Sequence, residues 1–203
     1  MLPELGQVAL LAALVLSLLL SVLPLLGAQR GHAAAMATAR PLAFSLLGAV
    51  AAAYAVLTWA FIAHDFSVAY VAKNSNTLLP AMYQFSAVWG AHEGSLLLWV
   101  LILCLWLAAV ALYSKPLPEA VAARVLSVMG MVALGFLAFT VFTSNPFERV
   151  LPAPPEGHDL NPLLQDPGLI FHPPLLYIGY VGFSVAFAFA IAALIDGRVD
   201  SQW

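Results

Sequence analysis

The fold is decided by apolar stretches such as Ser95–Tyr113, which reads SLLLWVLILCLWLAAVALY and carries no charged residue. Four further mostly apolar stretches lie at about Leu5–Gly27, Pro41–Ala63, Val125–Thr143 and Pro174–Ile195. A helix needs roughly 20 mostly apolar residues to cross a bilayer. Because open sheet edges are not tolerated in lipid, each stretch is expected to be a helix. The sequence therefore predicts an all-α, polytopic integral membrane helix bundle with about five transmembrane helices.

The composition excludes most other classes of protein. The 203 residues are 63% hydrophobic and 8% charged, whereas soluble domains carry about 25% charged residues. The mean hydropathy of the chain is +0.96. With 7 Lys and Arg against 10 Asp and Glu, no basic surface is available for nucleic acid. The expected surroundings are membrane lipid, and residues 1–203 are expected to form one membrane module.

The links between the apolar stretches alternate in length, and their charges predict an orientation. Residues 28–40 and 114–124 form short links, whereas residues 64–94 and 144–173 form long ones. Basic residues gather on cytoplasmic links of membrane proteins. Five of the seven lie on the short links and the C-terminal tail: Arg30, Arg40, Lys115, Arg124 and Arg198. The N-terminus and both long links are therefore expected on the outer side, which is the periplasm in a bacterium, and the C-terminal tail in the cytoplasm.

His172 is the strongest candidate for binding a cofactor. Proline at position 173 favours an extended backbone at His172, and Pro173 with Pro174 suits the first turn of the fifth helix. The imidazole is then expected at the outer mouth of a membrane helix, beside Phe171 and Tyr177. This arrangement suits one axial ligand of haem iron. The alternative is a histidine that anchors a helix end among lipid headgroups.

A second group of candidates precedes the third predicted span. Trp89, His92 and Glu93 lie in WGAHEGS, which ends at Ser95. Ser95 is a possible helix cap, and the His–Glu pair offers groups that orient a ligand or take a proton. The structural alternative is that these groups only satisfy backbone donors at the helix start.

Other chemistry finds little support in the residues. Cys104 is the single cysteine and lies inside a span, so neither a dithiol motif nor an intrachain disulfide is possible. The sequence shows no phosphate-binding loop, nucleophile elbow or zinc spacing, so no catalytic residue is assigned. His32 is given no role, His64 is expected to be a polar cap at a helix end, and His158 is expected to be solvated.

Four strings together resemble the N-terminal part of the CcmF family, the large membrane subunit of the bacterial system I cytochrome c haem lyase. They are Asn74–Thr77 (NSNT), Trp89–Val100 (WGAHEGSLLLWV), Thr143–Phe147 (TSNPF) and Asp159–Ser184 (DLNPLLQDPGLIFHPPLLYIGYVGFS). The resemblance covers essentially the whole chain. It implies a multi-pass protein of the bacterial inner membrane that takes part in cytochrome c-type biogenesis.

The resemblance also implies a cofactor and partners. CcmF-type proteins receive haem from the haem chaperone CcmE and, with CcmH, attach it to apocytochrome c. The vinyl groups of the haem form thioethers with the cysteines of a Cys-x-x-Cys-His motif in the periplasm. The first periplasmic haem histidine of the family falls on His172, which would ligate the haem iron, while Trp89, His92 and Glu93 would line or support that region.

The sequence departs from the family in length. The Trp-rich external motif, the second periplasmic histidine and the histidine pair for a b-type haem have no counterpart before Trp203. The chain is therefore expected to be a truncated or split form, inactive alone and dependent on the remaining C-terminal part, with b-type haem present only when that part is. A scaffold that docks CcmE or CcmH is the alternative function. A transporter subunit is a third, although the helix centres lack carboxylates.

Overall fold

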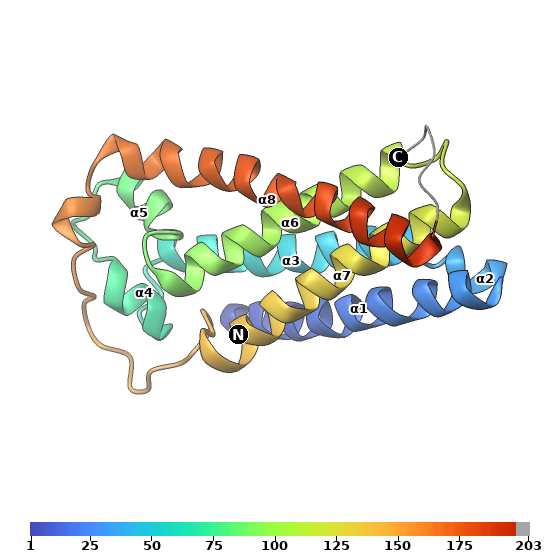
Figure 1. Ribbon diagram of the computed structural model, residues 1–203. Coiled ribbons are helices and arrows are strands. Elements are labelled where there is room, and N and C mark those ends of the chain that lie inside the picture. The colour runs from blue at the N-terminus through green and yellow to red at the C-terminus, as the bar shows by residue number, and fades with distance from the viewer. Residues whose placement is uncertain (198–203) are drawn as a thin grey trace.

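The computed structural model describes residues 1–197, which are mostly helical (Figure 1). Five helices are long and apolar enough to cross a membrane. They are α1 (Leu2–Arg30), α3 (Ala39–Ile62), α6 (His92–Tyr113), α7 (Glu119–Thr143) and α8 (Pro167–Asp196). Short helices lie in the links: α2 (Ala33–Met36), α4 (Ala69–Asn74), α5 (Ala81–Ala87) and the 3-10 turn η1 (Pro162–Leu164). Apart from one isolated bridge, residues 1–197 form no β-structure, so the predicted all-α membrane bundle is confirmed.

The long helices run alongside one another in alternating directions (Figure 1). Helix α1 packs against α3 and α7, α6 packs against the same two helices, and α8 lies along α6 and α7 at the edge of the bundle. Both long links lie at the end that holds the N-terminus, and the short links lie at the opposite end. We call these the long-link end and the short-link end. This grouping agrees with the alternation of link lengths in the sequence.

Small residues allow α1 and α7 to approach closely. Buried residues of α1 recur every three or four positions: Leu10, Ala13, Ser17, Leu20, Pro24 and Gly27. A Cβ atom added at Gly130 of α7 would lie 3.0 Å from Cγ of Leu20. Because lipid tails are as apolar as leucine, membrane helices associate through such close packing more than through the hydrophobic effect.

Helix α8 begins earlier than predicted, and this corrects the expected backbone at His172. The helix starts at Pro167, and Asp166 caps it by accepting a hydrogen bond of 2.7 Å from the N–H of Gly168. Aspartate at the cap followed by proline at the first position is a favourable helix start. His172 therefore lies in a helical turn and not on an extended segment. Pro173 and Pro174 lie inside the helix and not in its first turn.

Helix α6 also begins before its predicted start. It starts at His92, with Ala91 at the cap position, so the expectation that Ser95 caps this helix is wrong. Tyr70 fixes the approach to the helix, because its hydroxyl donates to the carbonyl of Val88 at 3.1 Å and accepts from the N–H of Ala91 at 3.2 Å. A buried phenol thus supplies the partners that a capping side chain would otherwise provide.

The two long links pack together into one layer. The N–H of Ala69 donates to the carbonyl of Glu148 at 2.8 Å, and the N–H of His158 donates to the carbonyl of Ala72 at 2.7 Å. The Asn76 amide donates to Asp159 at 2.8 Å. Links that are separated in the sequence by two membrane-spanning helices, α6 and α7, therefore support each other across the long-link end.

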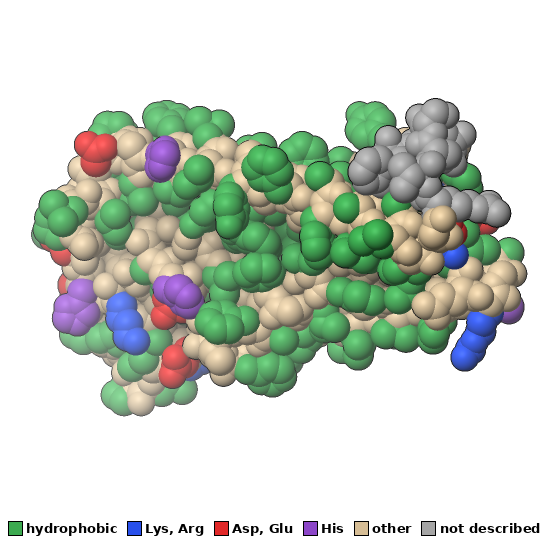
Figure 2. All heavy atoms as spheres, in the orientation of Figure 1, with side chains coloured by type: hydrophobic (Ala, Val, Ile, Leu, Met, Phe, Trp, Pro, Cys, Tyr) green, Lys and Arg blue, Asp and Glu red, His purple; other side chains and the backbone are tan. Residues whose placement is uncertain are grey.

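Charged side chains lie mainly at the two ends of the bundle. Figure 2 shows acidic, basic and histidine side chains gathered at both ends, with a largely hydrophobic band between them. At the short-link end, Arg124 forms an ion pair with Asp196, which joins the start of α7 to the end of α8. Arg40 donates to the carbonyls of Ala111 and Ser114. Of the five basic residues predicted for this side, Arg198 lies outside the described residues.

Candidate functional site

The candidate ligand His172 lies in the second turn of α8, at the long-link end, and its side chain is exposed. The face of α8 that packs on the bundle carries Pro173, Tyr177 and Val181 at four-residue spacing. Because each helical residue turns by about 100°, His172 lies beside this face and not on it. Its large exposed neighbours are apolar: Phe171, Leu175 and Leu176. Within residues 1–197 the imidazole makes no hydrogen bond or ion pair, so its ring nitrogens remain available to a ligand.

Trp89 is brought to the helix that carries His172. Its side chain is buried, with 6% of its surface exposed, and the Phe85 ring meets it edge-on at 5.2 Å between ring centroids. The indole N–H donates to the carbonyl of Leu169 at 2.8 Å. Trp89 therefore contacts the backbone of α8 three residues before His172.

A hydrogen bond between side chains also joins α6 to the first half of α8. The hydroxyls of Ser95 and Tyr177 lie 2.6 Å apart. The sequence predicts Ser95 as a helix cap and places Tyr177 beside the His172 imidazole, but it does not predict that the two hydroxyls pair. Two hydroxyl groups at helix positions carry no spacing signal that would reveal such a bond between helices.

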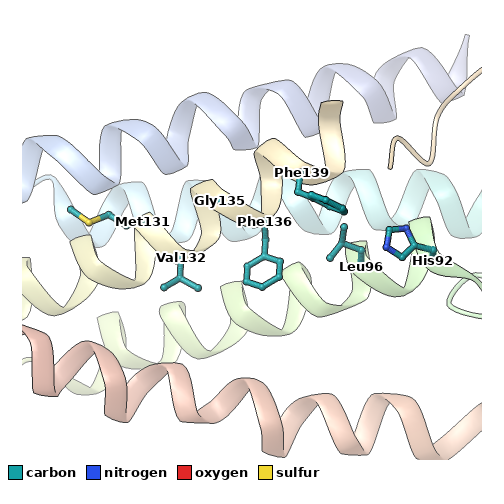
Figure 3. Close-up of a pocket in the computed structure, with 7 residues that line it drawn as sticks. All are labelled: His92, Leu96, Met131, Val132, Gly135, Phe136 and Phe139. Carbon is teal, nitrogen blue, oxygen red and sulfur yellow. The ribbon is translucent and has the colours of Figure 1, made fainter. Parts of the chain in front are cut away.

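His92 turns toward α7 and not toward His172. Its Nδ1 lies 3.1 Å from Oγ of Ser144, and its ring meets Phe139 edge-on at 6.0 Å. It lines an open groove of about 550 Å³ between α6 and α7, together with six other residues: Leu96, Met131, Val132, Gly135, Phe136 and Phe139. Figure 3 shows His92 at one end of this groove and Met131 at the other.

Glu93 lies in the first turn of α6 and is half-buried. A carboxylate in a first turn is favourable, because it faces the positive end of the helix dipole. Among residues 1–197, no hydrogen bond or ion pair joins Glu93 or His92 to His172. The three candidates near the start of α6 therefore do not form one site. Trp89 contacts α8, His92 contacts α7, and Glu93 has no bond to His172 within this range.

The remaining histidines and the cysteine form no shared site. His64 follows α3 with a positive φ of 52°, and His158 bonds through its backbone. His32 occupies the N-cap position of α2 at the short-link end without a capping bond from its side chain. Cys104 is buried. In the described part of the chain no three His, Cys, Asp or Glu side chains gather into a metal centre. Iron held by a porphyrin differs from such a centre, because the protein needs to supply only axial ligands.

Comparison with known proteins identifies a family. The family model described as cytochrome C assembly protein matches residues 89–202. Over the whole chain, 63% of residues are identical to the cytochrome c-type biogenesis protein CcmF of Pseudomonas aeruginosa and 61% to that of Escherichia coli. A solved structure titled cytochrome c heme lyase CcmF superposes with a TM-score of 0.84 over 99% of this chain, at 32% identity. The chain spans about a third of the length of these proteins, 31% and 32% of the two relatives and 32% of the solved chain.

Proposed function

Because this chain belongs to the cytochrome c assembly protein family and corresponds to the N-terminal part of CcmF, we propose that it is a haem-handling membrane module of a cytochrome c haem lyase. In this proposal His172 supplies one axial ligand to haem on the periplasmic side. The observation that carries it is an exposed imidazole that has no hydrogen-bond or ion-pair partner within residues 1–197 and lies among apolar side chains near the start of α8.

The surroundings of His172 fit a haem. Iron in a porphyrin takes a neutral imidazole nitrogen as an axial ligand. The porphyrin plane is large and apolar, and Phe171, Leu175 and Leu176 provide exposed apolar surface beside the ring. Haem, when bound, would supply the vinyl groups that form thioethers with the cysteines of apocytochrome c.

The chain alone provides one such ligand, so the proposed activity depends on the rest of a CcmF protein. A second axial histidine, the b-type haem, CcmE, CcmH and apocytochrome c belong to that larger assembly. We further propose that the chain lies in the bacterial inner membrane with its N-terminus in the periplasm and its C-terminal tail in the cytoplasm. Trp89 supports the site from the segment before α6 through its bond to α8, whereas His92 faces the α6–α7 groove and Glu93 makes no bond to His172 among the described residues.

The test is the substitution His172→Ala, in cells that lack their own CcmF and also express the remaining two thirds of a relative. Removing a residue that only supports a metal ligand already costs about 10–100-fold in metal affinity or activity, so we expect loss of the ligand itself to lower holocytochrome c at least about tenfold. His158→Ala is the matched control, because this histidine also lies at the long-link end and, within residues 1–197, bonds only through its backbone N–H. Undiminished holocytochrome c in His172→Ala would overturn the ligand role.

A second candidate function is a scaffold that docks other maturation subunits. The link between α7 and α8 favours it, because Glu148, Glu156, Asp159 and Asp166 make this outer segment acidic. A photo-crosslinking side chain at Leu163, which is 87% exposed, should then capture CcmE or CcmH whether or not haem is present. The same side chain at Ala34, at the short-link end, is the control. A link that captures neither subunit in the assembled complex has no docking role.

A further inference from the structure

Consecutive prolines leave two carbonyl groups of α8 without their helical donors. In an α-helix the N–H of each residue donates to the carbonyl four residues earlier, and proline has no N–H. Pro173 and Pro174 therefore remove the donors for the carbonyls of Leu169 and Ile170. Helices bend where backbone hydrogen bonds of this kind are missing. In α8 the missing bonds lie in the turns that carry His172.

Trp89 supplies the donor that Pro173 removes. Its indole N–H donates at 2.8 Å to the carbonyl of Leu169, which is the group that the N–H of residue 173 would otherwise reach. Trp89 is well placed to act as a fixed donor, because its side chain is buried and Phe85 packs against its ring. A rigid group outside the helix thus replaces an internal helical bond.

A second tie lies on the other side of His172. The Ser95 and Tyr177 hydroxyls are 2.6 Å apart. Leu169 lies three residues before His172 and Tyr177 five after it, which correspond to about 4.5 and 7.5 Å along the helix axis. The segment from Trp89 to Ser95 therefore holds α8 both before and after the candidate ligand.

We propose that Trp89 is a positioning residue for His172, acting through the Leu169 carbonyl that Pro173 leaves free. The bond fixes the first turns of α8 against the start of α6 and so fixes the direction of the imidazole. Metal ligands depend on such supporting contacts for their orientation. The ligand role of His172 rests on the function proposed above, whereas the bond from Trp89 to α8 does not.

The first test is Trp89→Phe in the full 203-residue chain, which keeps the aromatic ring and removes the donor. Hydrogen exchange of the amides in residues 169–176 is measured by mass spectrometry. Loss of one hydrogen bond should speed this exchange roughly 2- to 12-fold. Trp106→Phe is the matched control, because Trp106 also donates to a carbonyl of α8, that of Ile178 at 3.0 Å. Residue 182 is glycine and keeps its N–H, so the Ile178 carbonyl retains its helical donor.

The second test asks whether Trp89 acts through the missing N–H of Pro173. In Pro173→Ala the helix regains a donor for the Leu169 carbonyl, so adding Trp89→Phe should no longer speed exchange in residues 169–176. This coupling separates the proposed bond from simple packing of the ring. Equal effects of Trp89→Phe in both backgrounds, or no effect beyond that of Trp106→Phe, would overturn the proposal.

A haem readout separates failure of this inference from failure of the proposed function. Haem is added to the full chain, and its absorption spectrum and reduction potential are compared among the variants. Trp89→Phe should shift both, and His172→Ala should remove the imidazole signature. If His172→Ala leaves the spectrum unchanged, the ligand role fails while the exchange data still decide the bond. If His172→Ala abolishes the signature and Trp89→Phe leaves spectrum and potential unaltered, the positioning role fails.

Discussion

Gly94 is the residue on which the start of α6 depends. A Cβ atom at this position would lie 1.7 Å from the carbonyl oxygen of Val88 and 2.7 Å from the Tyr70 hydroxyl oxygen. Real Cβ atoms do not come so close to backbone, so any larger residue must displace the loop that carries Trp89. Because that loop also holds α8, one glycine affects the geometry of two helices.

Gly94→Ala should therefore destabilise the protein, by about 1–3 kcal/mol as is usual for overpacking. Thermal unfolding in detergent measures the change. Gly179→Ala in α8 is the control, because an added Cβ there meets nothing within 4 Å. A melting temperature equal to that of Gly179→Ala would show that the Val88 loop moves aside without cost.

At the scale of elements, the two long links depend on each other. Polar bonds join them: Glu156 accepts from the hydroxyl and the backbone N–H of Thr77, the latter at 3.1 Å. The bond from the Thr77 hydroxyl lowers the pKa of Glu156 below its ordinary value of 4.5. The bonds from the backbone N–H groups of Thr77 and Gly157 act in the same direction. A lowered pKa means that the ionised carboxylate stabilises the folded links.

The sign of the pH dependence follows from this shift. The contribution of Glu156 is present above the unfolded pKa and is lost as pH falls through the lower folded pKa. Since Glu156 is exposed, we expect only an about 2- to 5-fold loss of exchange protection at the Thr77 amide between about pH 6 and pH 3, corrected for intrinsic rates. Glu156→Gln should show weak protection across the whole range. Protection in the native chain that does not change with pH would contradict the assignment.

At the scale of the whole molecule, the bundle separates two chemically different ends. The long-link end carries His172, the acidic link between α7 and α8, and the short helices α4 and α5. The short-link end carries most of the basic residues and the Arg124–Asp196 pair. Because basic residues favour the cytoplasm, the long-link end is expected to face the periplasm.

Single cysteines at the two ends test this orientation. Leu78→Cys lies at the long-link end, where Leu78 is 90% exposed, and Ala34→Cys lies at the short-link end, where Ala34 is exposed. A thiol reagent that does not cross membranes should label Leu78→Cys in intact spheroplasts and Ala34→Cys only after permeabilisation. The native Cys104 is buried and serves as the unlabelled background. The reverse labelling pattern would invert the proposed topology.

The sequence by itself determined the class of fold, the approximate spans and the family. Lipid leaves the backbone few choices, so long apolar stretches such as Ser95–Tyr113 have to be helices. A string as long as Asp159–Ser184 is distinctive enough to indicate the family that it resembles. The backbone predicted at His172 and the cap predicted at Ser95 were wrong. Pro173 and Pro174 indicate a helix start, but Asp166-Pro167, seven residues earlier, is the more favourable one.

Only the tertiary structure decided which groups meet. The bond from Trp89 to the Leu169 carbonyl joins residues 80 positions apart, and that from Ser95 to Tyr177 joins residues 82 apart. No local preference encodes such pairs, because each depends on how α8 packs along α6 and the segment before it. Pro173 in the sequence indicates that the Leu169 carbonyl lacks its helical donor. Only the packing of the helices determines that the Trp89 indole N–H is the donor that reaches it.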